Sequence, residues 1–146
     1  MEKGIDFLTL LQQEFDCKGV DIRTYSPLTL AFVGDGIYEL LVRTVIVERG
    51  NRSVESIHKE KSRYVKAQTQ AAMAESILEV MTPEEQSIYR RGRNANIHST
   101  AKNASVAEYR KATGFEALCG YLYLTNQNER MVELVREAFS RLGISL

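Results

Sequence analysis

Three acidic side chains stand inside the most apolar segments of this sequence. Asp35 and Glu39 are the only charged residues of SPLTLAFVGDGIYELLV, which spans 26–42. Glu116 is the only charged residue between Lys111 and Glu129. Carboxylates are rarely buried unless they are paired or hold a metal, because removing water from an ionised acid costs several kcal/mol. The pattern therefore indicates either a divalent-metal site or acids that pair with Arg or Lys in the core.

Hydroxyl residues before proline or before a glutamate three positions later mark where helices begin. Ser26-Pro27 and Thr82-Pro83 combine a capping hydroxyl with a proline at the first helical position. Thr82 and Ser105 each have a glutamate three residues later, which makes a capping box. We expect helices near 4–16, 27–49, 54–80, 83–91, 105–126 and 129–142. Because no pair of strands stands out, the sequence predicts an all-α fold.

Glycines lie next to both of the central acids. Gly34 and Gly36 flank Asp35, and Gly120 follows Glu116 by one helical turn. Glycine inside a helix costs up to about 1 kcal/mol relative to alanine. These glycines therefore indicate either close packing of two helices or access for a ligand beside the acids.

The helices at 27–49 and 105–126 are the elements that would position these acids. The first is apolar nearly all round, which is typical of a buried central helix. If the two helices cross near Asp35 and Glu116, their oxygens converge on one hard cation. Mg²⁺ suits such a site because it prefers oxygen ligands and keeps several waters. Glu39, one turn after Asp35, is expected to support the site, with direct ligation left open.

The formal net charge of +0 conceals two basic stretches. Residues 49–70 carry six Lys or Arg against two Glu, and residues 90–111 carry six against one. Such clusters are solvated helix faces in many proteins. Two of them in a neutral chain favour an anionic partner.

Length, hydropathy and cysteine usage limit the class of protein. A chain of 146 residues is one domain by length, spanning 1–146. Charged residues interrupt its richest apolar window, 27–47, so we expect no membrane span. The N-terminus lacks the features of a signal peptide. Cys17 and Cys119 are isolated, which indicates reduced thiols in a cytoplasmic protein.

Three segments resemble the ribonuclease III family. FVGD at 32–35 resembles the signature helix of its catalytic domains, and GFEALCGYLYL at 114–124 resembles its second acidic helix. Together with RRGRNAN at 90–96, these segments are most similar to Mini-ribonuclease III, the branch without a double-stranded RNA-binding domain. The resemblance runs from about residue 22 to residue 142.

The resemblance implies a homodimeric helical bundle like the ribonuclease III catalytic domain. Such a dimer cuts both strands of double-stranded RNA with Mg²⁺ and leaves 5′-phosphate and 3′-hydroxyl ends. Asp35 matches the catalytic aspartate of the first helix, and Glu116 matches the glutamate of the second. The resemblance points to maturation of the large-subunit ribosomal RNA precursor. The alternative is a catalytically inactive RNA-binding module with the same fold.

The sequence departs from full-length ribonuclease III at three acidic positions. Leu28 and Ala31 stand where that family has glutamates, and Thr113 stands where it has an aspartate. A site with two of the usual acids must take its remaining ligands from water and RNA phosphate. Thr113, like Glu39, is expected to support the two acids rather than to bind the metal.

The second basic stretch gives the expected RNA contacts. RNA duplexes are bound mainly through shape, phosphates and 2′-hydroxyls. The segment 91–102 supplies cations, amides and hydroxyls of this kind. The expected RNA-binding residues are Arg91, Arg93, Asn94, His98 and Lys102. For His98 a backbone or phosphate contact is favoured over general-acid catalysis.

Overall fold

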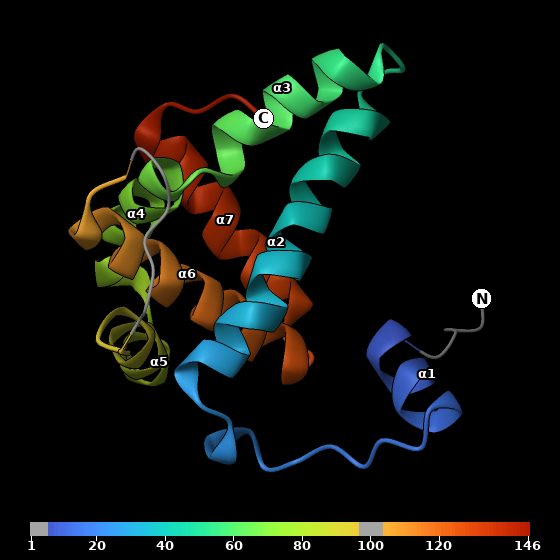
Figure 1. Ribbon diagram of the computed structural model, residues 1–146, viewed down its shortest axis with the longest axis vertical. Coiled ribbons are helices and arrows are strands. Elements are labelled where there is room, and N and C mark those ends of the chain that lie inside the picture. The colour runs from blue at the N-terminus through green and yellow to red at the C-terminus, as the bar shows by residue number, and fades with distance from the viewer. Residues whose placement is uncertain (1–5, 97–103) are drawn as a thin grey trace.

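The computed structural model describes residues 6–96 and 104–146, and within these ranges the chain forms helices and no strand. Figure 1 shows the α-helices, which are α1 (Phe7–Glu14), α2 (Pro27–Glu48), α3 (Val54–Val65), α4 (Ala67–Ser76), α5 (Pro83–Arg93), α6 (Val106–Leu124) and α7 (Asn128–Leu142). Short 3-10 turns, η1 (Ile22–Thr24) and η2 (Leu78–Val80), precede α2 and α5. The all-α prediction is confirmed. In the described part of the chain, none of the helices combines the length and apolarity needed to cross a bilayer.

Three of the predicted helix starts are confirmed by their caps, and the first helix begins at Phe7 rather than near residue 4. The hydroxyls of Ser26, Thr82 and Ser105 each accept a hydrogen bond from the backbone N–H three residues later. Glu85 and Glu108 complete capping boxes, since each carboxylate accepts from the backbone N–H of its own N-cap residue. Local side-chain chemistry therefore fixes where α2, α5 and α6 begin.

The single helix expected over 54–80 is wrong, because the chain breaks into α3 and α4. Lys66 lies between them with φ −66° and ψ 154°, an extended conformation. The side chains of Thr69 and Gln70 each donate, at 2.7 Å, to a backbone carbonyl of the last residues of α3. These side chains stabilise the break by satisfying carbonyls that lose their helical partners there.

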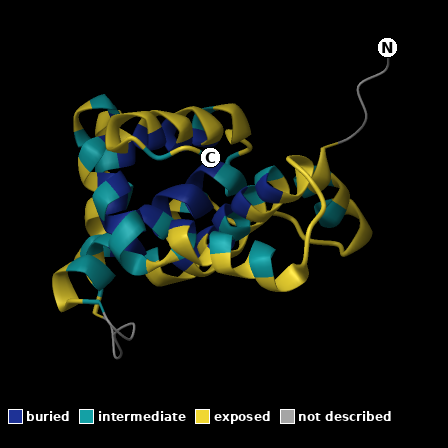
Figure 2. Ribbon diagram, turned by 90° about the horizontal axis from the view of Figure 1, so that it is seen from above, coloured by how far each residue is buried: buried dark blue, intermediate teal, exposed yellow. Residues whose placement is uncertain are grey.

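Helices α2 and α6 cross at the centre of the molecule, and α4, α5 and α7 pack around α6 (Figure 1). Figure 2 shows the buried residues gathered where these helices meet, while α1 contributes no buried residue. The largest buried side chains of the crossing pair include Leu30, Tyr38, Val42 and Ile46 of α2 and Phe115, Leu118 and Leu122 of α6. The segments that carry the central acids therefore form the core.

Two glycines allow the backbones of α2 and α6 to touch. A Cβ atom on Gly34 would lie 1.6 Å from the carbonyl oxygen of Glu116. A Cβ atom on Gly120 would lie 1.9 Å from the carbonyl oxygen of Leu30. Gly36, by contrast, has no atom within 4 Å of such a Cβ. Close packing of the two helices therefore explains Gly34 and Gly120. It does not explain Gly36, because no described atom lies near that position.

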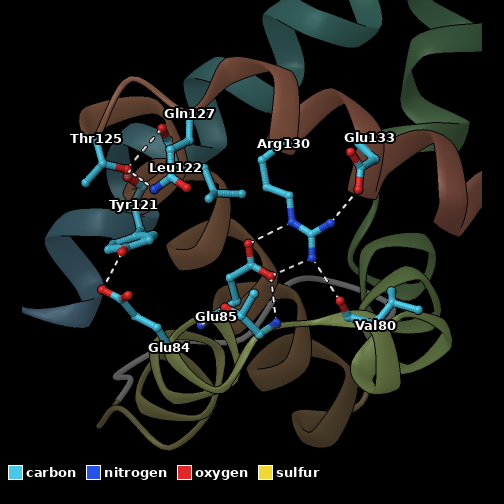
Figure 3. A network of polar contacts seen from close by, with 10 residues as sticks. Val80, Glu84, Glu85, Tyr121, Leu122, Thr125, Gln127, Arg130 and Glu133 are labelled. Carbon is cyan, nitrogen blue, oxygen red and sulfur yellow. Dashed lines mark hydrogen bonds and ion pairs between the residues drawn. The ribbon is translucent and has the colours of Figure 1, made fainter.

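A separate polar network joins α5 to α7 (Figure 3). Arg130 donates to both carboxylate oxygens of Glu85 at 2.9 Å and to the carbonyl of Val80 at 2.8 Å. Glu85 is only 3% exposed, so a charged, bidentate partner is what its burial requires. Tyr121 donates a hydrogen bond to the neighbouring Glu84. This network holds the outer helices in place without using the central acids.

We predict that Gly120→Ala destabilises the protein by roughly 3 kcal/mol or more, because the methyl group cannot fit without moving one helix. Gly36→Ala is the matched control. It is expected to leave the free energy of unfolding unchanged or to raise it by up to about 1 kcal/mol. Urea unfolding of both variants measures the difference. Equal stability of the two variants would mean that the helices are not in backbone contact.

Candidate active site

The crossing of α2 and α6 brings Asp35 and Glu116 together. Asp35 follows Gly34, whose backbone contacts the carbonyl group of Glu116 itself. Asp35 is exposed and Glu116 is partly buried, and the two carboxyl groups interact. The contact that the sequence suggests between these acids is therefore present in the fold.

The surroundings of Glu116 favour its neutral form in the protein without metal. Burial raises the pKa of Glu116, and the adjacent Asp35 carboxylate raises it further, to about 8. A hydrogen bond from the amide of Gln70 opposes this rise. Two negative charges are thus unfavourable at this place. A bound cation would remove that cost, and perturbed acids of this kind are typical of functional sites.

Neither Asp35 nor Glu116 forms a salt bridge with Lys or Arg within the described residues. Glu39 does, because its Oε1 lies 2.8 Å from Lys61 Nζ and 3.1 Å from Arg43 Nη2. The hydrogen bond from Lys61 is the main cause that lowers the pKa of Glu39. The ion pair weighed for Asp35 and Glu116 is therefore not formed by either acid within the described residues, and Glu39 pairs with Lys61 and Arg43 instead.

Lys61 and Gln70 belong to this region, and sequence reasoning missed both. Lys61 is 8% exposed and Gln70 is 2% exposed. Gln70 Nε2 lies 3.5 Å from Glu116 Oε2. Each residue stands in a polar helical segment, where a lysine or a glutamine usually faces solvent. The sequence therefore carries no signal for their burial.

Thr113 is buried in α6, three residues before Glu116. Its hydroxyl donates to the carbonyl of Tyr109 at 3.0 Å, one turn back along the same helix. The structure thus places Thr113 next to the acids in sequence, with its hydroxyl directed to the backbone.

Three of the expected RNA-binding residues lie at the C-terminal end of α5. Arg91 and Asn94 are exposed. The guanidinium of Arg93 lies 5.7 Å from the centre of the Tyr89 ring, and its Nε donates to Asn94 at 3.3 Å. His98 and Lys102 lie outside the described residues. These three side chains therefore form a polar, basic helix end.

Close packing fixes this basic end against α6. A Cβ atom on Gly92 would lie 2.8 Å from the Cα atom of Gly114, two residues before Glu116. A Cβ atom on Gly114 would lie 2.7 Å from the carbonyl oxygen of Tyr89. The end of α5 therefore keeps a fixed place beside the segment that carries Glu116.

Part of the basic charge is neutralised within the fold. In the stretch 49–70, Arg52 pairs with Glu60. Lys61 of the same stretch pairs with Glu39 of α2. In the other stretch, Lys111 pairs with Glu75. The exposed arginines near the end of α5 therefore carry more weight as candidate contacts for an anion.

Comparison with known proteins gives a consistent result. The Ribonuclease III domain family matches residues 28–127, a range that contains both central acids. The chain is 44% identical over 125 residues to the Mini-ribonuclease 3 of Enterococcus faecalis, covering 84% of this chain and 95% of that protein. It is 48% identical over 115 residues to the Mini-ribonuclease 3 of Symbiobacterium thermophilum, covering 79% and 88%. A crystal structure of a protein from Fusobacterium nucleatum superposes with a TM-score of 0.75 at 31% identity, covering 82% of this chain and 96% of that one.

The raised pKa of Glu116 predicts how stability depends on pH in chelator. Between its ordinary value of 4.5 and about 8, the folded protein keeps a proton that the unfolded chain has released. The free energy of unfolding should therefore fall as pH rises through this window, by roughly 1.4 kcal/mol for each unit of pKa difference at most. Urea unfolding at a series of pH values measures this slope.

Glu116→Gln isolates the contribution of the two acids, since it removes the perturbed carboxyl group and leaves the groups outside this pair unchanged. The free energy of unfolding of this variant should change less with pH than that of the wild type. Near pH 8 the variant should be the more stable protein. Asp35→Asn should flatten the curve in part, because it removes one of the two causes that raise the pKa of Glu116. Identical pH slopes for the wild type and Glu116→Gln would show that Glu116 is not perturbed.

Proposed function

Because the chain belongs to the ribonuclease III family, in its Mini-ribonuclease 3 branch, and is therefore an endoribonuclease, we propose that it cuts double-stranded RNA with Mg²⁺. The observation that carries this proposal is the contact between Asp35 and Glu116 at the crossing of α2 and α6. Glu116 is a partly buried acid whose pKa the neighbouring Asp35 carboxylate raises, and neither acid has a salt bridge among the described residues, so a cation is needed for both to be charged together.

The two carboxylates fit the chemistry of Mg²⁺. They supply hard oxygen donors from two rigid helices, which is the ligand type that this ion prefers. Across the described residues, no three His, Cys, Asp or Glu side chains gather to hold a metal. Asp35 and Glu116 would therefore share the ion with water and RNA phosphate. When bound, Mg²⁺ supplies an activated water and neutralises charge on the phosphodiester.

The neighbouring side chains keep the two acids in place. Glu116 gives up its proton so that both carboxylates can act as ligands. Glu39 is held by Lys61 and Arg43, which supports a positioning role one turn from Asp35. The hydroxyl of Thr113 donates to the carbonyl of Tyr109 in the turn before Glu116, which fixes the orientation of this buried side chain.

The basic end of α5 is proposed to hold the RNA backbone beside the acids. Arg91, Arg93 and Asn94 lie on a helix end that packs against α6 next to Glu116. We include His98 and Lys102 of the same segment on sequence grounds. Contacts with phosphates and 2′-hydroxyls position a duplex without reading its sequence. The large-subunit ribosomal RNA precursor is the natural duplex that the family resemblance supports.

A homodimer is proposed because α2 exposes a row of apolar side chains. Leu28, Phe32, Leu40 and Val47 are 40%, 81%, 54% and 56% exposed. Spacings of four, eight and seven residues place them on one side of the helix. Contiguous exposed apolar surface is typical of an interface. A two-fold pairing through α2 would place two active sites on one duplex, one for each strand.

Incubation with long double-stranded RNA tests the proposed activity. We expect cleavage in Mg²⁺ and none in chelator, and we expect Asp35→Asn and Glu116→Gln to reduce cleavage to background. The acids are ligands rather than scaffold, so both variants should melt in chelator at the wild-type temperature or above it.

Two outcomes would contradict this account. Retention of RNA without cleavage in Mg²⁺ would select the inactive binding module of the same fold. A melting temperature that drops sharply for both variants would mean that the acids are structural, since breaking a buried ion pair costs about 3–5 kcal/mol. Light scattering on the active sample should give the mass of two chains, and an active monomer would exclude the dimer.

The salt dependence of RNA binding tests the end of α5. Affinity should fall linearly with salt on logarithmic axes, and Arg91→Ala or Arg93→Ala should each reduce the slope by roughly one. Arg23→Ala is the control, because Arg23 is an exposed arginine that pairs with Asp21 near the N-terminus. Fluorescence anisotropy in chelator gives the slopes. If all three variants keep the wild-type slope, the end of α5 does not contact RNA.

A further inference from the structure

Gln70 is a buried polar side chain next to the proposed metal ligands. It is 2% exposed and lies in the first turn of α4. Its Nε2 atom lies 2.7 Å from the carbonyl oxygen of Val65 and 3.5 Å from Glu116 Oε2. An amide carries two N–H donors, so it can serve both acceptors at once. Gln70 therefore links the carboxyl group of Glu116 to the backbone of α3.

The break between α3 and α4 creates this link. At the end of a helix the last carbonyl groups lack intrahelical partners. Lys66 is extended, so the carbonyl of Val65 is available to a side chain. Thr69 takes the carbonyl of Arg63 in the same way, at 2.7 Å. The amide of Gln70 is thereby anchored on rigid backbone rather than on another mobile side chain.

The anchoring bond also fixes which way the amide group faces. A carbonyl oxygen accepts hydrogen bonds only, so the Nε2 atom of Gln70 must face Val65. The other end of the amide, Oε1, is buried and has no hydrogen-bond partner among the described residues. An unsatisfied buried acceptor costs about 1–3 kcal/mol. The bond to Val65 explains the Nε2 end of the side chain, but it leaves the buried Oε1 end without a structural role.

We propose that Gln70 is a positioning residue for the cation site. Its N–H groups hold the carboxylate of Glu116 in place on the backbone of α3, and its Oε1 accepts a hydrogen bond from a water of the hydrated cation. Mg²⁺ keeps several of its waters when it binds to protein, so such a water is available. This inference rests on the proposed metal-dependent function. It adds a contribution from α4 to a site otherwise built from α2 and α6.

The test measures Mg²⁺ binding to the protein without RNA, through the rise of melting temperature with MgCl2 concentration. Gln70→Met keeps the length of the side chain and removes both polar groups. Gln86→Met is the matched control, because Gln86 Nε2 also donates to a backbone carbonyl, that of Leu78 at 2.9 Å, away from the acids. Gln70→Met should weaken Mg²⁺ binding roughly 10–100-fold, the usual effect of losing a residue that orients a ligand. Gln86→Met should leave it within about twofold of the wild type.

A second measurement needs no variant and decides the matter if Gln70→Met does not fold. The side-chain amide resonances of Gln70 in the wild-type protein should shift with MgCl2 at the same midpoint as the melting temperature. Those of Gln86 should stay in place. Equal Mg²⁺ affinities for the two glutamine variants, or Gln70 resonances that do not respond to MgCl2, would overturn the inference.

Glu116→Gln separates failure of this inference from failure of the proposed function. If the wild type and Glu116→Gln respond equally to MgCl2, the acids do not bind the cation, and both proposals fall. If Glu116→Gln loses the response while Gln70→Met keeps it, the metal site stands and the role of Gln70 falls. Loss of the response in both variants, with Gln86→Met unaffected, supports both proposals.

Discussion

The backbone contact between α2 and α6 is the constraint on which the rest of the structure depends. At Gly34 and Gly120 even a methyl group would overlap a carbonyl group of the facing helix. This close approach brings Asp35 beside Glu116, although 80 residues separate them in the chain. Outer helices then cover α6. The end of α5 packs against α6 in the same way, with the backbone of Gly92 against that of Gly114. Glycines therefore set the geometry that the acids use.

Charge is treated differently at the carboxyl groups of Glu85 and Glu116. Glu85 has an arginine that binds both of its oxygens, as a stable interior requires. Glu116 has a second acid and a neutral amide, and burial raises its pKa to about 8. A sequence optimised for stability alone would neutralise or remove this acid. Locally unfavourable chemistry of this kind is expected at functional sites, where stability is given up for ligand binding.

The sequence predicted best what depends on neighbours in the chain. Ser26, Thr82 and Ser105 mark helix starts because their hydroxyls bond to amides three residues away. The two central acids could be identified from the sequence, because a charged residue within an apolar segment is unusual in any fold. The break at Lys66 was not visible, since no proline or glycine marks it and side chains that bond back to the backbone stabilise it. The role of Gln70 follows from that break, so it too required the tertiary structure.

The central claim is that the glycine crossing makes Asp35 and Glu116 one cation site. A crystal structure of the protein grown with Mn²⁺, which replaces Mg²⁺ at oxygen sites and scatters anomalously, tests it most directly. The account predicts an anomalous peak within ligand distance of carboxylate oxygens from both residues. Density for an arginine or lysine side chain between the two acids, or a peak elsewhere with none between them, would contradict it.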